Sequence, residues 1–139
     1  MQDLVQQTVV LVKPDGVKRG LVGEILTRFE RVGLKIMAMK MVWVERDLVG
    51  KHYKDEKEYL TTIGKRTLDD YQKYGMDSAE DLGTADPYKI GKMVREWNMD
   101  ALSSGPVVAI LLEGVMAVEI VRKMVGATEP KTAAPGTIR

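Results

Sequence analysis

Three basic residues stand at places where a cation could bind an anion. Lys13 ends a run of apolar and hydroxyl residues, Arg122 lies in the last turns of an expected helix, and Arg139 follows Pro135-Gly136. Ammonium and guanidinium groups bind phosphate, and a polyphosphate requires several donors that converge. Taken singly, each residue suits an ordinary role as a strand-end lysine, a favourable charge at a helix C-terminus or a tail charge. Only a common geometry would unite them.

Other candidate groups are weaker. His52 is the single histidine, so it is the obvious candidate for a general base or nucleophile, but spacing reveals no acidic partner and a structural role is favoured. The acidic pairs Asp69-Asp70 and Glu80-Asp81 could hold Mg²⁺, yet such runs are usually solvated faces. Gly64-Lys65-Arg66-Thr67 lacks the first glycine and the final Ser or Thr of a P-loop, so we expect a solvated helix or loop segment there.

Composition limits the class of protein. The 139 residues suit one domain, and 21 basic against 20 acidic residues give a net charge of +1. This balance argues against non-specific binding to nucleic acid or membranes, so an anion site must be a local cluster. The absence of cysteine excludes disulfides and thiolate chemistry and fits a reducing cytosol. We expect neither a membrane span nor a signal peptide.

Periodicity predicts the first half of the fold. Residues 8–12 favour a buried strand, and Pro14 with Gly16 favours a tight turn after it. Apolar residues at helical spacing predict a helix over 21–32, which Gly33 ends. Residues 34–44 form a strand pattern that is apolar on both faces. Because such a strand is covered on both sides, we expect a subunit interface on one of them and therefore an oligomer.

The second half adds mostly helices and a second buried strand. We expect the following segments: helices over 45–54 and 56–74 with interruptions near Gly64, a loop over 75–87, a helix over 88–98, a central strand over 107–112, a helix over 115–125 and an extended tail over 127–139. This order predicts an α+β sandwich with helices on one face, which lacks one terminal strand of a βαββαβ unit.

Several segments, in this order, carry a resemblance to one family. They are Lys13-Pro14-Asp15-Gly16-Val17, Arg19 to Ile25, His52-Tyr53, Ser104 to Ala109, Glu113-Gly114, Gly126-Ala127-Thr128 with Pro130, and Pro135 to Arg139. Together they resemble the nucleoside diphosphate kinases over most of the chain outside residues 60–100. The resemblance implies a ferredoxin-like antiparallel sheet, a homo-oligomer (hexamer or tetramer) and a cytoplasmic enzyme of nucleotide metabolism. It also implies transfer of the γ-phosphate from ATP or another nucleoside triphosphate to a nucleoside diphosphate, with Mg²⁺, through a phosphohistidine in a ping-pong reaction.

The resemblance also implies roles for single residues. Lys13 is similar to the family's lysine that contacts the transferred phosphate. Arg122, Thr128 and Arg139 resemble its phosphate ligands, and Tyr53 would lie beside the site. The family's base-stacking aromatic has no clear counterpart, and Leu60 or Tyr59 could replace it.

Two departures from the family are expected. A helical insert around residues 61–100 interrupts what we interpret as a single domain over 1–139. The family's phosphorylated histidine lies beyond the position of Arg139, and His52 aligns with a different histidine, so we expect the nucleophile outside these residues. The alternative is an inactive nucleotide-binding or oligomer-forming module of the same fold.

Overall fold

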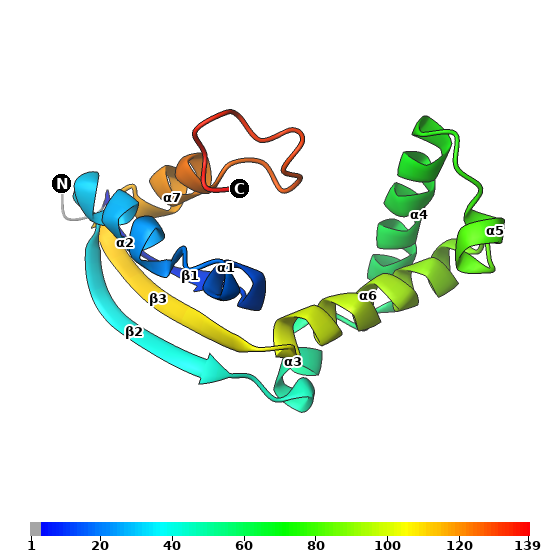
Figure 1. Cartoon of the computed structure of the whole chain (residues 1–139), viewed down its shortest axis with the longest axis horizontal. Helices are drawn as coiled ribbons and strands as arrows, with labels where there is room; N and C mark the ends of the chain where they lie inside the picture. The colour runs from blue at the N-terminus through cyan, green and yellow to red at the C-terminus, as the bar shows by residue number, and fades with distance from the viewer. Residues whose placement is uncertain (1–3) are drawn as a thin grey trace. The chain divides into compact units, whose positions relative to one another are not determined.

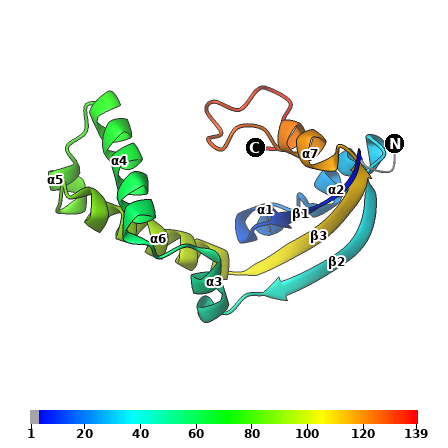
Figure 2. The same ribbon diagram turned by 180° about the vertical axis from the view of Figure 1, so that it is seen from behind.

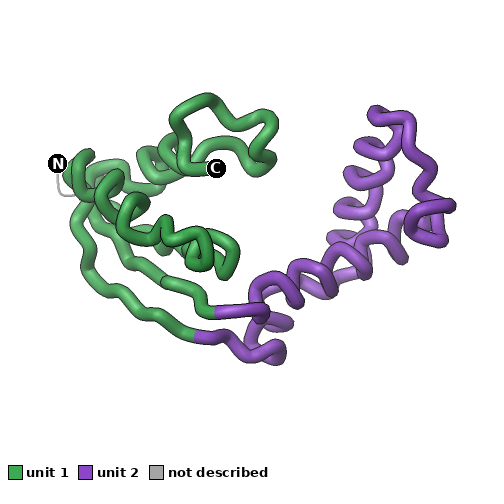
Figure 3. Tube along the Cα trace, in the orientation of Figure 1, with its two compact units in different colours: residues 1–42, 106–139 green, residues 43–105 purple. Residues whose placement is uncertain are grey.

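The computed structural model describes residues 4–139, which divide into two compact units. Figure 3 marks the first unit, residues 4–42 and 106–139, in green and the second, residues 43–105, in purple. The strands and the two ends of the chain belong to the first unit, and the long helices belong to the second (Figure 1).

An antiparallel sheet forms the base of the first unit. Within the described residues its strands are β1 (Val5–Val12), β2 (Lys35–Trp43) and β3 (Pro106–Val115), in the spatial order β1-β3-β2. β1 runs antiparallel to β3, with Val5 opposite Val115 and Val12 opposite Val108. β3 is therefore the central strand, as the sequence predicts.

Helices cover one face of this sheet. α1 (Pro14–Lys18), α2 (Val22–Arg31) and α7 (Ala117–Val125) lie on the same side of the strands in both views (Figures 1 and 2). The arrangement confirms the predicted α+β, ferredoxin-like fold with helices on one face.

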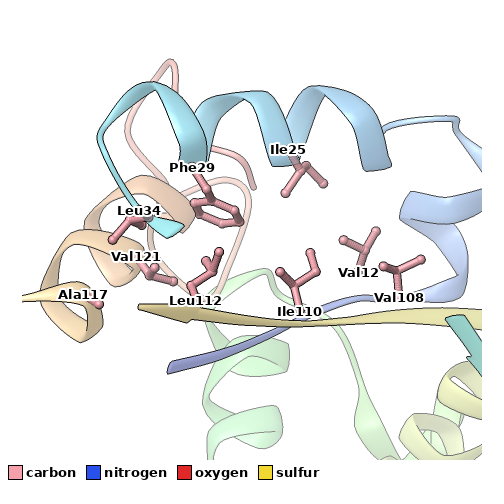
Figure 4. Close-up of a cluster of buried hydrophobic side chains, with 9 residues drawn as sticks. All are labelled: Val12, Ile25, Phe29, Leu34, Val108, Ile110, Leu112, Ala117 and Val121. Atoms are coloured by element: carbon pink, nitrogen blue, oxygen red, sulfur yellow. The ribbon is translucent and has the colours of Figure 1, made fainter. Parts of the chain in front are cut away.

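The core of the first unit lies between α2, α7 and the inner face of the sheet. Phe29, Ile110 and Leu112 are 0% exposed, and Figure 4 shows Phe29 and Ile25 pointing from α2 toward the strand residues below. The buried members of this cluster, hereafter the sheet–helix core, are Val12, Ile25, Phe29, Leu34, Val108, Ile110, Leu112, Ala117 and Val121. Even-numbered residues of β1 and β3 face it, because side chains alternate along a strand.

One sequence prediction about the first unit is wrong, and one stays a prediction. Residues 14–18 form the short helix α1 rather than a tight turn, because Pro14 occupies its first position, where its fixed φ suits a helix and its missing N–H costs nothing. β2 carries apolar residues on both faces: Ile36 packs against the sheet–helix core, and Met37, Met39 and Met41 on the outer face are exposed, so the subunit interface expected there stays a prediction.

The second unit consists of helices α3 (Arg46–His52), α4 (Lys57–Lys73), α5 (Ser78–Leu82) and α6 (Pro87–Ser103). α4 continues through Gly64 without the expected interruption, and α6 extends to Ser103 rather than ending near 98. The expected loop over 75–87 contains α5, because the Asp77 carboxylate accepts hydrogen bonds from the backbone N–H groups of Ala79 and Glu80 and thus caps a helix.

α4 and α6 cross with their backbones in direct contact. A Cβ atom on Gly64 would lie 1.7 Å from the carbonyl oxygen of Pro87, and one on Gly91 would lie 1.9 Å from the carbonyl oxygen of Leu60. Both distances are far below van der Waals contact with a backbone atom that cannot move away by a rotamer change. Only glycine fits at either position.

This crossing generates a stability prediction. Gly64→Ala should lower the free energy of unfolding by about 3 kcal/mol or more, because the new methyl group forces the helices apart. Gly23→Ala is the matched control: Gly23 also lies in a helix, and nothing is within 4 Å of the Cβ it would gain. That substitution should stabilise the protein by about 0.5–1 kcal/mol through helix propensity. Denaturant unfolding of both variants measures the difference, and equal effects would contradict the close crossing.

Candidate functional site

Lys13 occupies the junction between the sheet and α1. The residue before it, Val12, ends β1 and is buried in the sheet–helix core, whereas the Lys13 side chain is exposed. Lys13 is the N-cap residue of α1 and keeps an extended backbone, with φ −72° and ψ 168°. The change from strand to helix at this residue brings its ammonium group out of the core into solvent.

Arg122 and Lys123 are neighbours in the last turn of α7, but their environments differ. The Lys123 ammonium lies 2.8 Å from the Glu119 carboxylate, one helical turn away. The hydrogen bond between them raises the pKa of Lys123 and lowers the pKa of Glu119. Arg122 follows the buried Val121 and is exposed, and within residues 4–139 it forms no ion pair.

Arg139 is held against the C-terminal end of α7. The N–H of Ile138 donates to the carbonyl oxygen of Met124 at 2.9 Å, and the N–H of Arg139 donates to that of Val125 at 3.0 Å. The Arg139 guanidinium also donates to the carbonyl oxygen of Gly126 at 3.5 Å. These bonds satisfy carbonyl groups that a helix end leaves without intrahelical partners. The Ile138 side chain packs against the sheet–helix core.

The three basic residues therefore share one anchoring pattern. Lys13, Arg122 and Arg139 each directly follow a residue of the same apolar cluster: Val12, Val121 and Ile138. None of the three forms an ion pair with a carboxylate within residues 4–139. Each of these cations is available for an anionic ligand, but within residues 4–139 no shared cavity brings the three side chains together.

Two further features border these cations. Thr128 is exposed two residues beyond Gly126, which ends α7. An open cavity of about 790 Å³ beside α7 is lined by Arg122, Lys123, Gly126 and Thr137, among others, but not by Lys13, Thr128 or Arg139. The cavity thus contains one of the predicted phosphate ligands.

The second unit holds the other predicted site residues. Tyr53 is the C-cap residue of α3, and its ring meets that of His52 edge-on at 5.0 Å. Partial burial, with a smaller effect of Tyr59, raises the pKa of Tyr53. Leu60 is 0% exposed under α6, whereas Tyr59 is 43% exposed. Of the two candidates for stacking on a base, only Tyr59 offers a surface to a ligand in this conformation.

Sequence reasoning missed the residues that hold the segment before Arg139. The Arg28 guanidinium donates to the carbonyl oxygen of Gly136 at 2.9 Å and also pairs with Glu24 in the same helix. In the sequence, Glu24 and Arg28 form an ordinary i,i+4 surface pair, and nothing in that spacing indicates a contact with the tail. Gly126, with φ +88°, approaches Thr137 so closely that a Cβ there would lie 2.6 Å from the Thr137 hydroxyl oxygen.

Among residues 4–139, no group of three or more His, Cys, Asp or Glu side chains is arranged to hold a metal ion. No helix in that range has the length and apolarity to cross a membrane.

Comparison with known proteins identifies the family. The family model described as nucleoside diphosphate kinase matches residues 6–62 and 88–139. These two stretches contain Lys13, Tyr53, Arg122, Thr128 and Arg139. The chain belongs to the nucleoside diphosphate kinase family.

Individual relatives agree with this assignment. The nucleoside diphosphate kinase of Pyrobaculum aerophilum is 45% identical over 135 residues, which are 97% of this chain and 74% of that protein. A crystal structure of an NDP kinase from the same organism has a TM-score of 0.90 at 43% identity and covers 96% of this chain and 74% of that one. A transition-state mimic of the Borrelia burgdorferi enzyme with bound vanadate and ADP has a TM-score of 0.70 at 39% identity, with 98% of this chain and 64% of that chain covered.

The Gly126–Thr137 contact generates a prediction about the site. Gly126→Ala should detach residues 137–139 from α7, because the new methyl group collides with Thr137. Gly136→Ala is the matched control, since Gly136 has the same φ of +88° but nothing within 4 Å of its Cβ position. Hydrogen exchange at the Ile138 and Arg139 amides should be about tenfold faster in Gly126→Ala than in Gly136→Ala. Equal protection in the two variants would show that the contact does not hold the segment.

Proposed function

We propose that this chain is the phosphate-holding part of a nucleoside diphosphate kinase that moves the γ-phosphate of a nucleoside triphosphate to a nucleoside diphosphate. Family membership supports the reaction. The single observation that carries the assignment of residues is that the stretches matched by the family model contain Lys13, Arg122, Thr128 and Arg139, of which the three cations have no carboxylate partner in the described residues.

The chemistry fits these side chains. A transferring phosphoryl group carries charge on its three equatorial oxygens, so positioning and charge neutralisation account for most of the catalysis. Lys13 acts as a point charge on the transferred phosphate, whereas Arg122 and Arg139 present planar forks that match phosphate oxygens. Thr128 adds a hydroxyl donor. Tyr53 lies beside the nucleotide, and the exposed Tyr59 ring is better suited than the buried Leu60 to contact the base.

The phosphorylated group in this proposal is a histidine on the C-terminal side of Arg139. Transfer occurs in two half-reactions: the imidazole nitrogen bonds to the γ-phosphorus as the bond to the diphosphate leaving group breaks, and a second diphosphate then reverses the step. His52 is not this group. It lies in α3 of the second unit, with its ring against Tyr53.

Mg²⁺ enters as part of the substrate. Its hard, six-coordinate geometry is commonly completed by nucleotide phosphates and water with few protein ligands. The cations described above then neutralise the remaining phosphate charge.

We further propose that residues 1–139 form one kinase domain with the helical segment around 61–100 as an insert. The two stretches that the family model matches leave residues 63–87 between them. The lack of cysteine among the 139 residues supports a cytoplasmic location.

Labelling with γ-labelled ATP tests the reaction. The full-length protein should incorporate label that is lost in acid, and Lys13→Ala should lower transfer about 100-fold or more, because a charge-stabilising donor is removed. Lys18→Ala is the control: Lys18 is an exposed lysine in the last turn of α1, and its loss should leave transfer unchanged.

Three outcomes would contradict the proposal. An unlabelled protein would favour the inactive module of the same fold, and near-normal transfer by Lys13→Ala would remove that lysine from the site. Label that maps to His52 by peptide mass spectrometry would overturn the position given to the nucleophile.

We also propose that the protein is a homo-oligomer and that the sheet contributes to its interface. Odd-numbered residues of β1 and β2 point away from the helices, and Val9, Met39 and Met41 are 64%, 55% and 61% exposed. With Leu11 and Met37, they form an apolar surface, hereafter the outer sheet face. Contiguous exposed apolar residues of this kind mark interaction sites, and methionine adapts well to a partner surface.

Charge on the outer sheet face should therefore dissociate the oligomer. Met39→Glu places a carboxylate on the outer sheet face, where its burial in an interface would be costly. Val32→Glu is the control, because Val32 is a similarly exposed apolar residue at the end of α2. Sedimentation equilibrium should show a smaller species for Met39→Glu and the wild-type mass for Val32→Glu. An unchanged mass for Met39→Glu would exclude this face from the interface.

A further inference from the structure

Arg95 of α6 is a charged side chain with little contact with solvent. Its side chain is 14% exposed, whereas the neighbouring Glu96 side chain is 54% exposed. The Arg95 Nε donates to the carbonyl oxygen of Tyr53 at 3.2 Å, and Nη2 donates to that of Gly50 at 3.0 Å. Both acceptors belong to the C-terminal end of α3, where carbonyl groups lack intrahelical partners.

The hydrogen bonds of Arg95 leave it no free side for a ligand. Its Nη1 lies 3.6 Å from the Glu96 carboxylate, and Nε lies 3.9 Å from that of Asp55. Every nitrogen of the guanidinium group thus faces an acceptor within its own unit. Arg95 differs in this respect from Arg122 and Arg139, which have no carboxylate partner in the described residues. Its role is therefore internal to the second unit.

The close approach of α3 and α6 makes these bonds possible. A Cβ atom on Gly50 would lie 3.3 Å from Met99 Cε and 3.8 Å from Arg95 Nη2. Val49 and Met99 are buried nearby, so the guanidinium lies at the edge of an apolar contact. A charge placed there forms stronger hydrogen bonds than one in open solvent.

Tyr53 is the residue that this arrangement controls most directly. It is the C-cap of α3, where the chain leaves the helix with φ −90° and ψ 116°. Arg95 holds its carbonyl oxygen from one side, and the backbone N–H of Tyr53 donates to Val49 at 3.1 Å. With both backbone groups bonded, the position and direction of the Tyr53 Cα–Cβ bond are fixed, and the ring that projects from it meets the His52 ring.

We propose that Arg95 is a positioning residue for nucleotide binding: its hydrogen bonds to the carbonyl oxygens of Gly50 and Tyr53 hold the Tyr53 ring in the orientation that a bound nucleotide requires. The inference rests on the proposed function, because it takes Tyr53 to lie beside the nucleotide. Arg95 itself contacts neither the nucleotide nor the reacting atoms.

Three substitutions in the full-length protein test the inference. Arg95→Ala removes both hydrogen bonds, and Arg95→Lys keeps the charge but cannot reproduce the fork. Arg46→Ala is the matched control. Arg46 also links α3 to α6, through Glu96 and Asp100, but it lies in the first turn of α3 and touches neither carbonyl group. Far-UV circular dichroism identifies variants that fold.

The first readout is independent of nucleotide and activity. The ring protons of His52, assigned by the signal that disappears in His52→Gln, report the position of the neighbouring Tyr53 ring through its ring current. Arg95→Ala should shift these signals, Arg95→Lys should shift them less, and Arg46→Ala should leave them near the wild-type positions. Unchanged signals in Arg95→Ala would overturn the inference.

The second readout is nucleotide affinity. The Kd for Mg²⁺-ADP and the KM for the diphosphate should rise about tenfold in Arg95→Ala, with kcat within about twofold of the wild-type value, because ground-state binding is lost. A Kd of Arg95→Ala that stays at the wild-type value would overturn the inference. An equal rise of the Kd in Arg46→Ala would also overturn it, because Arg95 would then act only as one of several contacts between α3 and α6. Neither result affects the proposed function, which is tested separately by labelling of the wild-type protein and of Lys13→Ala.

Discussion

The packing of α2 and α7 on the inner face of β3 is the interaction on which the first unit depends. β3 is paired on both edges, so its backbone is satisfied and its side chains are free to fill the core. Burial of a side chain such as Ile110 or Leu112 contributes about 1.5–3 kcal/mol. The three basic residues add nothing to this core, yet each takes its position from a neighbour within it. In the proposed site, residues that stabilise the fold and residues that bind the ligand are therefore neighbours in the same segments.

The second unit depends on a different constraint, the close approach of helix backbones. Gly64 and Gly91 let α4 and α6 touch, and α3 is then joined to α6 by polar contacts along its length. The Trp43 indole N–H donates to the Ser103 carbonyl oxygen at 2.8 Å at one end, and Arg95 bonds Tyr53 at the other. In the second unit the helices are held together by close backbone packing at glycine and by hydrogen bonds from side chains to backbone carbonyl groups. In the first unit, burial of apolar side chains has this role. An exchange of Gly64 for a larger residue would therefore disturb the support of Tyr53 from a distance.

Local patterns were sufficient to predict some of these features but not others. The strands and α2 and α7 follow from alternation and helical spacing, because each buries one continuous apolar face. Gly64 was expected to interrupt a helix, since glycine is a poor helix former on its own. Gly64 is instead the residue at which α4 contacts the backbone of α6. This contact depends on Pro87 and Gly91, which are distant in sequence. Likewise, the apolar residues on the outer face of β2 indicate burial. The sequence alone does not show that they are exposed in the described part of this unit.

The phosphate-binding residues illustrate the same limit at a single side chain. Glu119 lies three residues before Arg122 and four before Lys123, and helical geometry allows a pair with either. In the structure it pairs with Lys123, at 2.8 Å. Arg122 therefore keeps its charge available, whereas a pair with Arg122 would have left Lys123 as the free cation. Spacing alone could not separate these two cases, and the family resemblance selected Arg122 without giving a reason. In the proposed site this choice of partner supplies a physical reason: Glu119 neutralises Lys123 and leaves the planar fork of Arg122 available for phosphate.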